Sequence, residues 1–512
     1  MLCKQYKRKN NMEKLAVIEL GASEITYSKL KFTPNGFFTV EQQIKEPVRL
    51  TQDLERDGYI KAARIEETIS ILKIFRKMMD AEGVTINLCY ADPVLSLARN
   101  QIAFLDEIYK TVSLHFRMLT FEEQADALHI ACLHSFSLVK GVACQIGDDS
   151  IQIIQYNRRT IVNKCNIPFG ALTLAEKFQD IADVSAKMDK MVDYITSFIR
   201  KEKWLYDLEE DIEFIGIGKF VEATGVLCRK STHYPLDIAH NYAITDSNFK
   251  SIFSLIKTLD IDKAKKLKGI SNLRADVLAG GIAVLKALFN DVVKSQMKVS
   301  TCGEMYGLVA RTLLAQAEKP MLDILGYSLS AVNEFYPSGQ DMNNIYDLAI
   351  ILYKQLKVLH RLNRNYVKIL RVSASMCLSG KRISYENYEK NGFNIILGSN
   401  IYGADHREIL MAAFVVANQN SDNFSLSDWV RYKDLLDDED ASAVKKLGLI
   451  VKLATLLNIT GSNAVKDIAC DILGDTVILK TSVEKDARLE ISQAMSMATD
   501  FKKIFGKNLQ IL

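Results

Sequence analysis

The sequence predicts an α/β protein with two related lobes, each built on a mixed β-sheet, followed by an all-helical region. Two stretches, residues 15–27 and 142–153, share one design: an apolar strand, a polar residue, a turn that begins with glycine, and a second strand. After each stretch, strands and helices alternate. From about Asp341 the pattern changes to long amphipathic helices. A repeated hairpin of this kind indicates two lobes that face each other across a cleft.

The composition is that of an ordinary globular protein. The chain has 512 residues, 48% hydrophobic and 25% charged, with a formal net charge of +3. So small a charge gives no drive toward nucleic acid or a membrane. The longest apolar run, residues 409–417, is shorter than the roughly 20 residues of a membrane-spanning helix. Nine scattered cysteines without a CxxC pair indicate reduced thiols and a cytoplasmic location.

The N-terminal stretch, residues 1–11, is basic and is not followed by the apolar run of a secretory signal. We expect a disordered tail, or a start assigned too early, with Met12 as the natural first residue. The remaining predicted boundaries place the first lobe at 12–137, the second lobe at 138–310 and the helical domain at 315–512.

The first lobe is predicted to begin with three strands and to continue with alternating helices and strands. Residues Pro34, Asn35 and Gly36 form the turn between the second and third strands. The predicted strands are residues 15–19, 25–32, 37–43, 86–91 and 116–119. The predicted helices are residues 62–80, 102–111 and 121–135.

The second lobe repeats this order. Its predicted strands are residues 141–146, 150–156, 160–167, 211–217 and 296–300. Its predicted helices include residues 186–200 and 275–289, and an exit helix begins near Gly303. The region beyond has one predicted helical stripe, formed by Ile345, Leu348, Leu352, Leu356 and Leu359. Residues 409–417 and 443–457 read as buried helices.

On several motifs the chain resembles the Ppx/GppA family of exopolyphosphatases and guanosine-pentaphosphate phosphohydrolases. That family carries Asp-x-Gly-Ser-Asn-Ser in its first hairpin and Asp-x-Gly-Gly-Gly-Ser-Thr-Glu in its second. Here residues 19–24 and 145–152 stand in those places, and residues 168–172, 379–383 and 403–408 are similar to further segments. The resemblance implies two actin-like lobes and a C-terminal HD-like domain. It also implies Mg²⁺-dependent hydrolysis of terminal phosphate from polyphosphate or pppGpp, and a homodimer.

The family's catalytic carboxylates fall on amides in this sequence. The resemblance puts the glutamate that activates water on Gln124, next to Glu123, and two further carboxylates on Gln145 and Gln152. An amide cannot act as a general base and is a poor substitute for a carboxylate at Mg²⁺. We therefore expect a catalytically impaired homologue that binds polyphosphate or (p)ppGpp, or that regulates a partner.

The resemblance also assigns the phosphate-binding positions, which are Gly21, Ser23, Arg49, Gly147, Ser150 and Gly218. Two of the family's arginines are replaced, by Thr26 and Ser96. Acidic residues stand where the family has glycine or serine, at Glu24, Asp148 and Asp149. If these acids face the cleft, we expect them to repel polyanions.

The sequence is also consistent with other functions. The chain could be a working phosphatase of this family with rebuilt acidic groups, or an ATP-using kinase of the actin-like class. Glu122 or Glu123 could replace the missing base, although adjacent helix residues point about 100° apart. Glu19, together with the three turn acids, could hold a cation, or these acids could simply be solvated.

The helical domain is expected to hold no metal. An HD site needs a His-Asp pair, and Cys377 and Leu378 stand in its place. Asn391 and Gly392 replace a further His-Ser pair. His406 remains and reads as a lone histidine on a surface helix, where a histidine is usually not a metal ligand. We interpret this domain as structural or as a binding surface.

Overall fold

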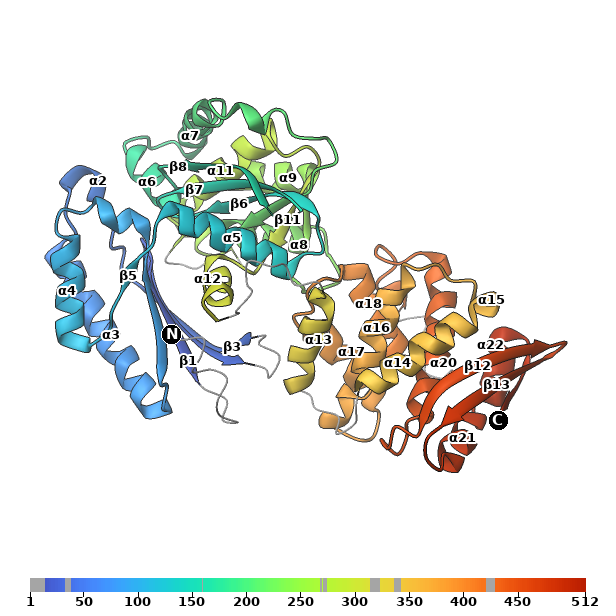
Figure 1. Ribbon diagram of the computed structural model, residues 1–512. Helices are drawn as coiled ribbons and strands as arrows, with labels where there is room; N and C mark the ends of the chain where they lie inside the picture. Colours follow the sequence, from blue (N-terminus) through green and yellow to red (C-terminus); the bar gives the residue numbers. More distant parts are fainter. Residues whose placement is uncertain are drawn as a thin grey trace. The chain divides into compact units, whose positions relative to one another are not determined.

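The computed structural model describes residues 14–32, 38–158, 160–267, 269, 274–313, 323–335, 342–419 and 429–512. The chain divides into two compact units, Met1–Ile324 and Leu325–Leu512 (Figure 1). The expected N-terminal tail and the turn at Pro34–Gly36 lie outside the described residues, so both stay predictions.

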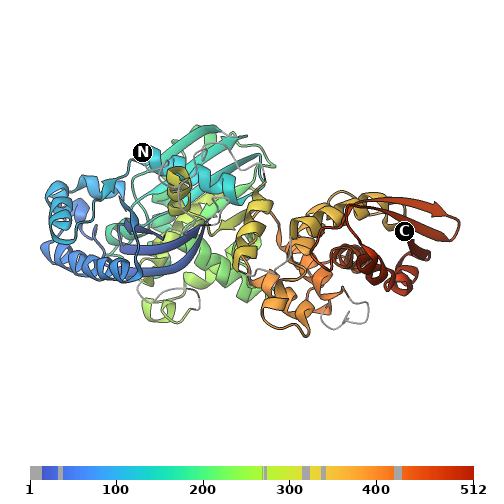
Figure 2. The same cartoon turned by 60° about the horizontal axis from the view of Figure 1, so that its bottom comes forward.

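The first sheet of the first unit has the strand order β3-β2-β1-β4-β5. Strand β1 pairs antiparallel with β2 and parallel with β4. The strands are β1 (Leu15–Leu20), β2 (Glu24–Phe32), β3 (Phe38–Pro47), β4 (Ile86–Ala91) and β5 (Arg117–Met118). Helices α2 (Leu54–Asp57), α3 (Ala62–Glu82) and α4 (Gln101–Val112) and the 3₁₀ turn η1 (Pro93–Leu97) accompany this sheet. Helices α3 and α4 lie along one side of this sheet (Figures 1 and 2). Their buried residues share one core with it.

The second sheet has the order β10-β11-β9-β6-β7-β8 and repeats the pattern of the first. Strand β6 pairs antiparallel with β7 and parallel with β9, as β1 does with β2 and β4. The strands are β6 (Lys140–Ile146), β7 (Ile151–Asn157), β8 (Thr160–Ile167), β9 (Phe214–Ile217), β10 (Ala243–Thr245) and β11 (Gln296–Ser300). The predicted duplication of an α/β lobe is confirmed by this shared topology.

Helices cover both faces of the second sheet because its strands alternate their side chains between two cores. Val142 and Cys144 face the core that includes α7 and α11, and Ala143 faces α5. The helices are α5 (Phe121–Ser135), α6 (Ala171–Lys177), α7 (Val184–Ile199), η2 (Lys203–Leu205), α8 (Lys219–Ser231), α9 (Asp246–Ile256), α10 (Ile261–Ala264), α11 (Leu278–Asp291) and α12 (Glu304–Leu313). Helix α5, which the sequence analysis assigned to the first lobe, therefore packs on the second sheet.

The second unit is helical over most of its length, as predicted. Its helices are α13 (Ile324–Phe335), α14 (Met342–Gln355), α15 (Lys357–His360), α16 (Tyr366–Met376), η4 (Ser379–Arg382), α17 (Tyr388–Gly398), α18 (His406–Ala417), α20 (Asp438–Leu456), α21 (Arg488–Met495) and α22 (Ala498–Phe505). The structure adds a sheet of β12 (Val465–Leu473), β13 (Thr476–Val483) and β14 (Asn508–Ile511). The unit is therefore not all-helical, and its likeness to an HD domain stays a prediction.

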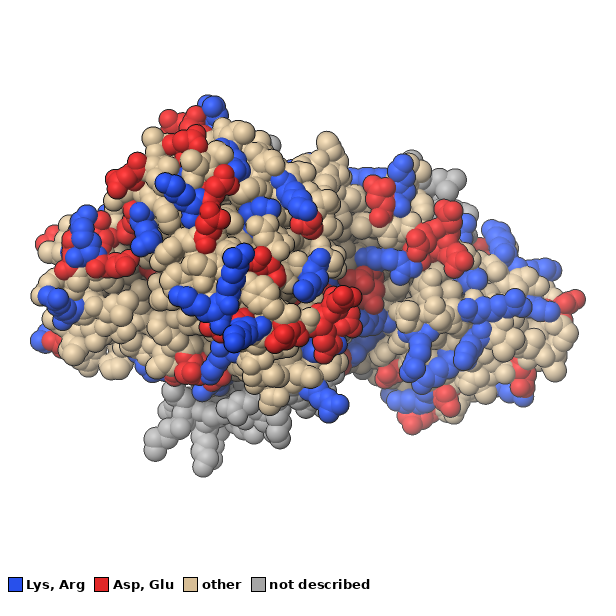
Figure 3. Space-filling view, turned by 90° about the horizontal axis from the view of Figure 1, so that it is seen from above, with Lys and Arg blue, Asp and Glu red and all other residues tan. Residues whose placement is uncertain are grey.

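The surface of the first unit mixes both signs of charge. Basic and acidic side chains alternate over the face shown in Figure 3, and no broad field of one sign is visible there. This agrees with the formal net charge of +3. Within the described part of the chain, no helix is both long enough and apolar enough to span a membrane.

Candidate functional site

Each sheet ends its first hairpin in a turn of the same geometry. The N–H group of Gly21 donates to the carbonyl of Glu24 at 3.0 Å, and that of Gly147 donates to the carbonyl of Ser150 at 2.9 Å. The N–H groups of the two residues after each glycine form no backbone hydrogen bond within the described chain. Adjacent free N–H groups of this kind form a nest that can bind an anion.

Gly218 lies beside the second turn, where no side chain fits. Its φ is +108°, and a Cβ atom would come within 2.6 Å of the Ile146 carbonyl oxygen. The start of α8 therefore lies directly against the end of β6. This close approach brings Lys219, the first residue of α8, to the edge of the cleft.

The two turns lie in one cleft with a volume of about 380 Å³. The structure brings most of the predicted site residues together there. The predicted residues that line it are Glu19, Gly21, Ser23, Gln124, Gln145, Gly147, Ser150 and Gly218. Gln152 lies behind the cleft wall, and Arg49 lines an adjacent pocket.

The three amides form one hydrogen-bonded network with a carboxylate. Gln145 and Gln152 face each other across the β6–β7 pair. The Gln152 Nε2 donates to Gln124 Oε1 at 2.6 Å, and Gln124 Nε2 donates to Glu304 Oε2 at 3.1 Å. The Gln145 Nε2 donates to the same Glu304 oxygen at 3.2 Å. Gln124 and Gln152 are each only 3% exposed, so the network is held within the wall of the cleft.

Glu304, the first residue of α12, is a site residue that the sequence analysis missed. It follows β11 by a few residues, and the end of a parallel strand is a position where site residues often lie. This position shortly after a strand is the sequence signal by which Glu304 could have been predicted. Burial raises its pKa to about 8, and the nearby Asp92 and Glu19 carboxylates add to the effect.

Two further carboxylates come from the first sheet. Glu19 is at the end of β1, and Asp92 follows β4, with its N–H donating to the Leu20 carbonyl at 2.9 Å. Burial raises the pKa of Glu19 to about 7 and that of Asp92 to about 6. Nearby Lys45 and Lys219 lower the pKa of Glu19, which limits the shift.

This arrangement does not fit a divalent cation. Mg²⁺ and Ca²⁺ take oxygen ligands, whereas Gln124 and Gln145 turn their NH₂ groups toward Glu304. No group of three or more His, Cys, Asp or Glu side chains in the described chain is arranged to hold a metal ion. Glu19 as a metal ligand therefore stays a prediction that this geometry does not support.

Asp149 is buried and accepts a hydrogen bond from the part of the chain that follows the first sheet's strand β3. Thr51 Oγ1 donates to Asp149 Oδ2 at 2.5 Å, and the carboxylate is only 6% exposed. Its other oxygen, Oδ1, is buried and has no hydrogen-bond partner among the residues that the structure describes. Burial raises the pKa of Asp149 to about 8, although the hydrogen bond from Thr51 lowers it. At neutral pH this side chain therefore carries less charge than a solvated turn acid.

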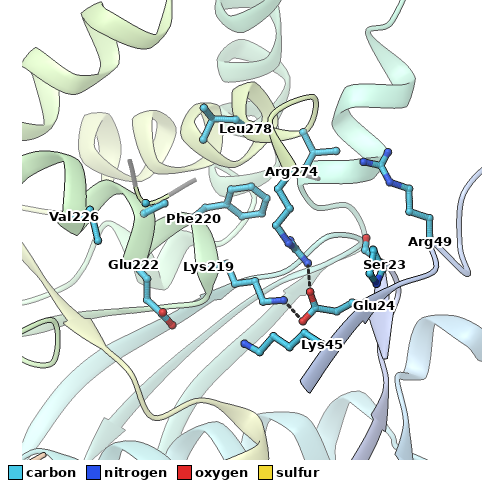
Figure 4. A pocket seen from close by; sticks show the side chains of 14 residues that line it. Ser23, Glu24, Lys45, Arg49, Lys219, Phe220, Glu222, Val226, Arg274 and Leu278 are labelled. Atoms are coloured by element: carbon cyan, nitrogen blue, oxygen red, sulfur yellow. Dashed lines mark hydrogen bonds and ion pairs between the residues drawn. The ribbon is translucent and has the colours of Figure 1, made fainter. Parts of the chain in front are cut away.

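The other two turn acids are ion-paired with basic residues of the second sheet's helices and loops. Arg274 donates to the Asp148 carboxylate in two contacts of 2.9 and 3.1 Å. Its Nη2 atom also lies 3.1 Å from Glu24 Oε2 (Figure 4). Lys219 also forms an ion pair with Glu24. These pairs offset the repulsion of polyanions that the sequence analysis expected.

Arg49 makes a bidentate ion pair with Asp276 at 2.7 and 2.9 Å. Its backbone has a φ of +51°, and its N–H donates to the Ser23 carbonyl at 3.0 Å. A non-glycine residue in this conformation is held there by its surroundings. The loop that carries Arg49 therefore closes over the first turn and connects it to the second half of the unit.

A second pocket of about 320 Å³ adjoins the cleft (Figure 4). Its basic side chains are Lys45, Arg49, Lys219 and Arg274, and its apolar wall includes Phe220, Ala223, Val226, Val277 and Leu278. Burial lowers the pKa of Lys219 to about 7, and Arg274 adds to the effect. The pocket can accept an anionic group beside an apolar one.

Glu123 has a structural role in the N-terminal turn of α5. It forms a capping box with Thr120 and an ion pair with Arg117, and these contacts lower its pKa despite partial burial. Glu122 is paired with Lys164 on the exposed side of the helix. Neither residue lines the cleft, so neither stands in for Gln124.

The residues at the HD positions are buried. Cys377 Sγ lies 3.6 Å from Thr455 Oγ1 and 3.2 Å from the Ala374 carbonyl, within the helical core. Leu378 is also buried. His406 is only 6% exposed, so it does not lie on the surface as the sequence analysis suggested. These side chains pack the domain.

Comparison with known proteins identifies relatives of the first unit. A model of the Ppx/GppA phosphatase family matches residues 32–316, more than half of the 512 residues. The bifunctional 3-dehydroquinate synthase/phosphatase of Fusobacterium nucleatum is 21% identical over 279 residues, which are 52% of this chain. The match covers only 40% of that relative's length.

Two solved structures share the fold. The Ppx/GppA family member of Aquifex aeolicus is 21% identical, with a TM-score of 0.50 over 59% of this chain and 98% of its own. An exopolyphosphatase of Cytophaga hutchinsonii is 16% identical, with a TM-score of 0.54 over 59% of this chain and 97% of its own. The two-sheet architecture is therefore the actin-like fold of this family.

Proposed function

The chain belongs to the Ppx/GppA phosphatase family, and we propose that it is a homologue with impaired catalysis, which binds polyphosphate or (p)ppGpp in a binding or regulatory role. The observation that carries this proposal is the network of Gln124, Gln145 and Gln152 on Glu304. Neutral amides have no lone pair basic enough to take a proton from water. Loss of a general base costs about 10²- to 10⁴-fold in rate.

The cleft retains groups that can bind phosphate. Both hairpin turns hold N–H groups without backbone partners, and nests of this kind bind anions. Arg49, Lys219 and Arg274 lie at the edge of the same region. Each of them is already paired with a carboxylate of the chain, so a phosphate must compete with that carboxylate.

Mg²⁺ supplies charge neutralisation for phosphoryl transfer in enzymes of this chemistry. The donor set in this cleft does not favour it, because two amide NH₂ groups point at Glu304. We therefore propose binding that does not depend on a divalent cation. For the assembly and its location we propose a cytoplasmic homodimer, and the eight described cysteines, all of which are free thiols, support a reducing environment.

A second candidate is a working phosphatase with rebuilt acidic groups. It is favoured by one observation, which is that Glu304 supplies a carboxylate to the point where the amides converge. The two candidates differ in rate. Steady turnover on the order of 1 s⁻¹ is ordinary for an enzyme, and an impaired homologue should remain far below it.

Binding and phosphate release should be measured side by side on the full chain. Tripolyphosphate, long-chain polyphosphate and ppGpp serve as ligands for calorimetric titration, with and without Mg²⁺ or Mn²⁺. We expect binding without rapid phosphate release. Turnover on the order of 1 s⁻¹ would favour the second candidate. Absence of binding to all three ligands would refute both.

A further inference from the structure

The carboxylate of Glu304 is held in a defined orientation by the side chains around it. Two amide groups donate to the same carboxylate oxygen, Oε2, from two different elements. The orientation of Gln124 is fixed because its own oxygen accepts the hydrogen bond from Gln152. The other oxygen of Glu304, Oε1, accepts no hydrogen bond from any residue that the structure describes. It is therefore available to a water molecule in the cleft.

Glu304 also lines the same cleft as both hairpin turns. A phosphate bound to the N–H groups of a turn would lie in the space that Glu304 faces. The charged groups near it are the carboxylates of Asp92 and Glu19, and the amides of Gln124 and Gln145 stabilise its ionised form. Lys45 and Lys219 also line the cleft.

Helix packing explains how Glu304 reaches this place. Gly307 lies against Ala127, where a Cβ atom would come within 1.8 Å of the Ala127 carbonyl oxygen. One turn earlier on each helix, Glu304 and Gln124 meet. The close approach of α12 and α5 thus places a carboxylate beside the amide that stands at the family's catalytic position.

We propose that Glu304 is a relocated general base and that any slow hydrolysis by this protein proceeds through it, with Gln124 and Gln145 as positioning residues. This inference rests on the proposed binding of a phosphate chain in the cleft. It requires no carboxylate at Gln124, Gln145 or Gln152. It also explains why the amides form an ordered network rather than a set of unrelated replacements.

The step is a hydrolysis. The oxygen of a water molecule forms a bond to the terminal phosphorus while one of its protons passes to Glu304. The bond between this phosphorus and the bridging oxygen breaks, and its electron pair stays on the shortened chain. The products are orthophosphate and a chain shorter by one phosphate. Glu304 then loses the proton to solvent, so no other reactant is needed.

The test uses the full chain in excess over tripolyphosphate and follows phosphate release. We expect Glu304→Gln to bind tripolyphosphate as the wild type does and to release phosphate about 100-fold more slowly. The combined variant Gln124→Glu with Glu304→Gln returns a carboxylate to the neighbouring position at constant charge and should recover part of the rate. Glu122→Gln, the same change on the exposed side of α5, is the matched control.

The pH dependence gives a second readout. The wild-type rate should rise as the pH passes the pKa of the base. Gln145→Leu should move this midpoint to higher pH, because it removes a donor that stabilises the carboxylate. A residue that only supports the fold would leave the midpoint unchanged.

Several outcomes would overturn the inference. One is a Glu304→Gln variant that binds tripolyphosphate and keeps the wild-type rate. Another is a wild type that binds tripolyphosphate but releases no phosphate above a protein-free control, a result that leaves the proposed binding function standing. If Glu304→Gln loses binding, the pH dependence of the rate decides. A midpoint that is shifted in Gln145→Leu relative to the wild type supports the inference. A wild-type rate that does not depend on pH refutes it.

Discussion

Asp149 shows how a single buried carboxylate can set a pH dependence for the whole protein. Its pKa is raised from the ordinary 3.8 to about 8 in the folded state. Between these values the folded protein binds more protons than the unfolded chain, so the free energy of unfolding falls as the pH rises. The slope from one such group is at most about 1.4 kcal/mol per pH unit. Glu304, with its raised pKa, acts in the same direction.

We therefore predict that Asp149→Asn stabilises the protein at alkaline pH. An asparagine keeps an oxygen for the Thr51 hydroxyl and cannot ionise, so the variant should gain more than about 1 kcal/mol over the wild type near pH 8. Below about pH 4, where the Asp149 carboxyl is protonated in both the folded and the unfolded protein, the two proteins should be similar. Denaturant unfolding at several pH values measures this, with the exposed Asp262→Asn as control. Parallel pH curves for wild type and variant would contradict it.

At the scale of residues, the sequence predicted residues that the structure brings to one cleft, but it did not predict their partners. The resemblance that places Gln124, Gln145 and Gln152 at the family's catalytic positions came from local motifs. The partner of Asp149 is Thr51, 98 positions earlier. Such pairings depend on how the two sheets meet, which no local pattern encodes. Glu304 was missed for the same reason, because its partners come from α5 and β6.

Among the elements, the contact between α5 and α12 makes a specific prediction. Gly307→Ala places a methyl group 1.8 Å from the Ala127 carbonyl oxygen, so α12 must move away from α5. Because Glu304 lies one turn before Gly307, its hydrogen bonds to Gln124 and Gln145 should weaken. We expect a destabilisation of about 1–3 kcal/mol. Because α12 forms part of the cleft wall, its displacement should also weaken the binding of tripolyphosphate.

Gly398→Ala is the matched control for this prediction. Gly398 ends α17, and a Cβ atom there would meet nothing within 4 Å. The same substitution should therefore leave stability unchanged or raise it slightly. Thermal unfolding and calorimetric titration of both variants measure the difference. If Gly307→Ala unfolds and binds as Gly398→Ala does, the helix contact does not position the cleft.

Strong periodic patterns predicted most elements of the first unit. The strand at 86–91, the helix at 121–135 and the strands at 160–167 and 296–300 have the predicted limits. The C-terminal sheet was not predicted. Strand β13 pairs with β14, and the two helices α21 and α22 separate them in the sequence. Exposed apolar residues such as Ile472 and Leu473 also weaken the alternation in β12.

At the scale of the first unit, ion pairs join its two halves. Arg49 and Glu24 belong to the part of the chain around the first sheet, and their partners Asp276, Arg274 and Lys219 belong to the second. The hydrogen bond from Thr51 to Asp149 also joins the first half to the second. In the unliganded protein, the carboxylates are thus ion-paired with the basic groups that would bind phosphate. A ligand must displace them, which lowers its net affinity.

This arrangement predicts that neutralising two turn acids strengthens ligand binding. In the double variant Glu24→Gln with Asp148→Asn, Arg274 and Lys219 lose their carboxylate partners and become available to phosphate. Two unit charges about 4 Å apart interact by about 4 kcal/mol at an effective dielectric of 20. Solvent screening at the mouth of the cleft reduces this, so we expect the affinity for tripolyphosphate to rise by about 10- to 100-fold.

Calorimetric titration at two salt concentrations measures this gain, which should shrink as salt screens the freed charges. Asp189→Asn, which removes the partner of Lys257 away from the cleft, is the control for a simple change in net charge. If the double variant binds no better than this control, the turn acids do not compete with phosphate. A variant that binds more tightly yet still releases phosphate slowly would show that the acids limit affinity, and that the rate is limited independently, as the proposed loss of catalytic carboxylates predicts.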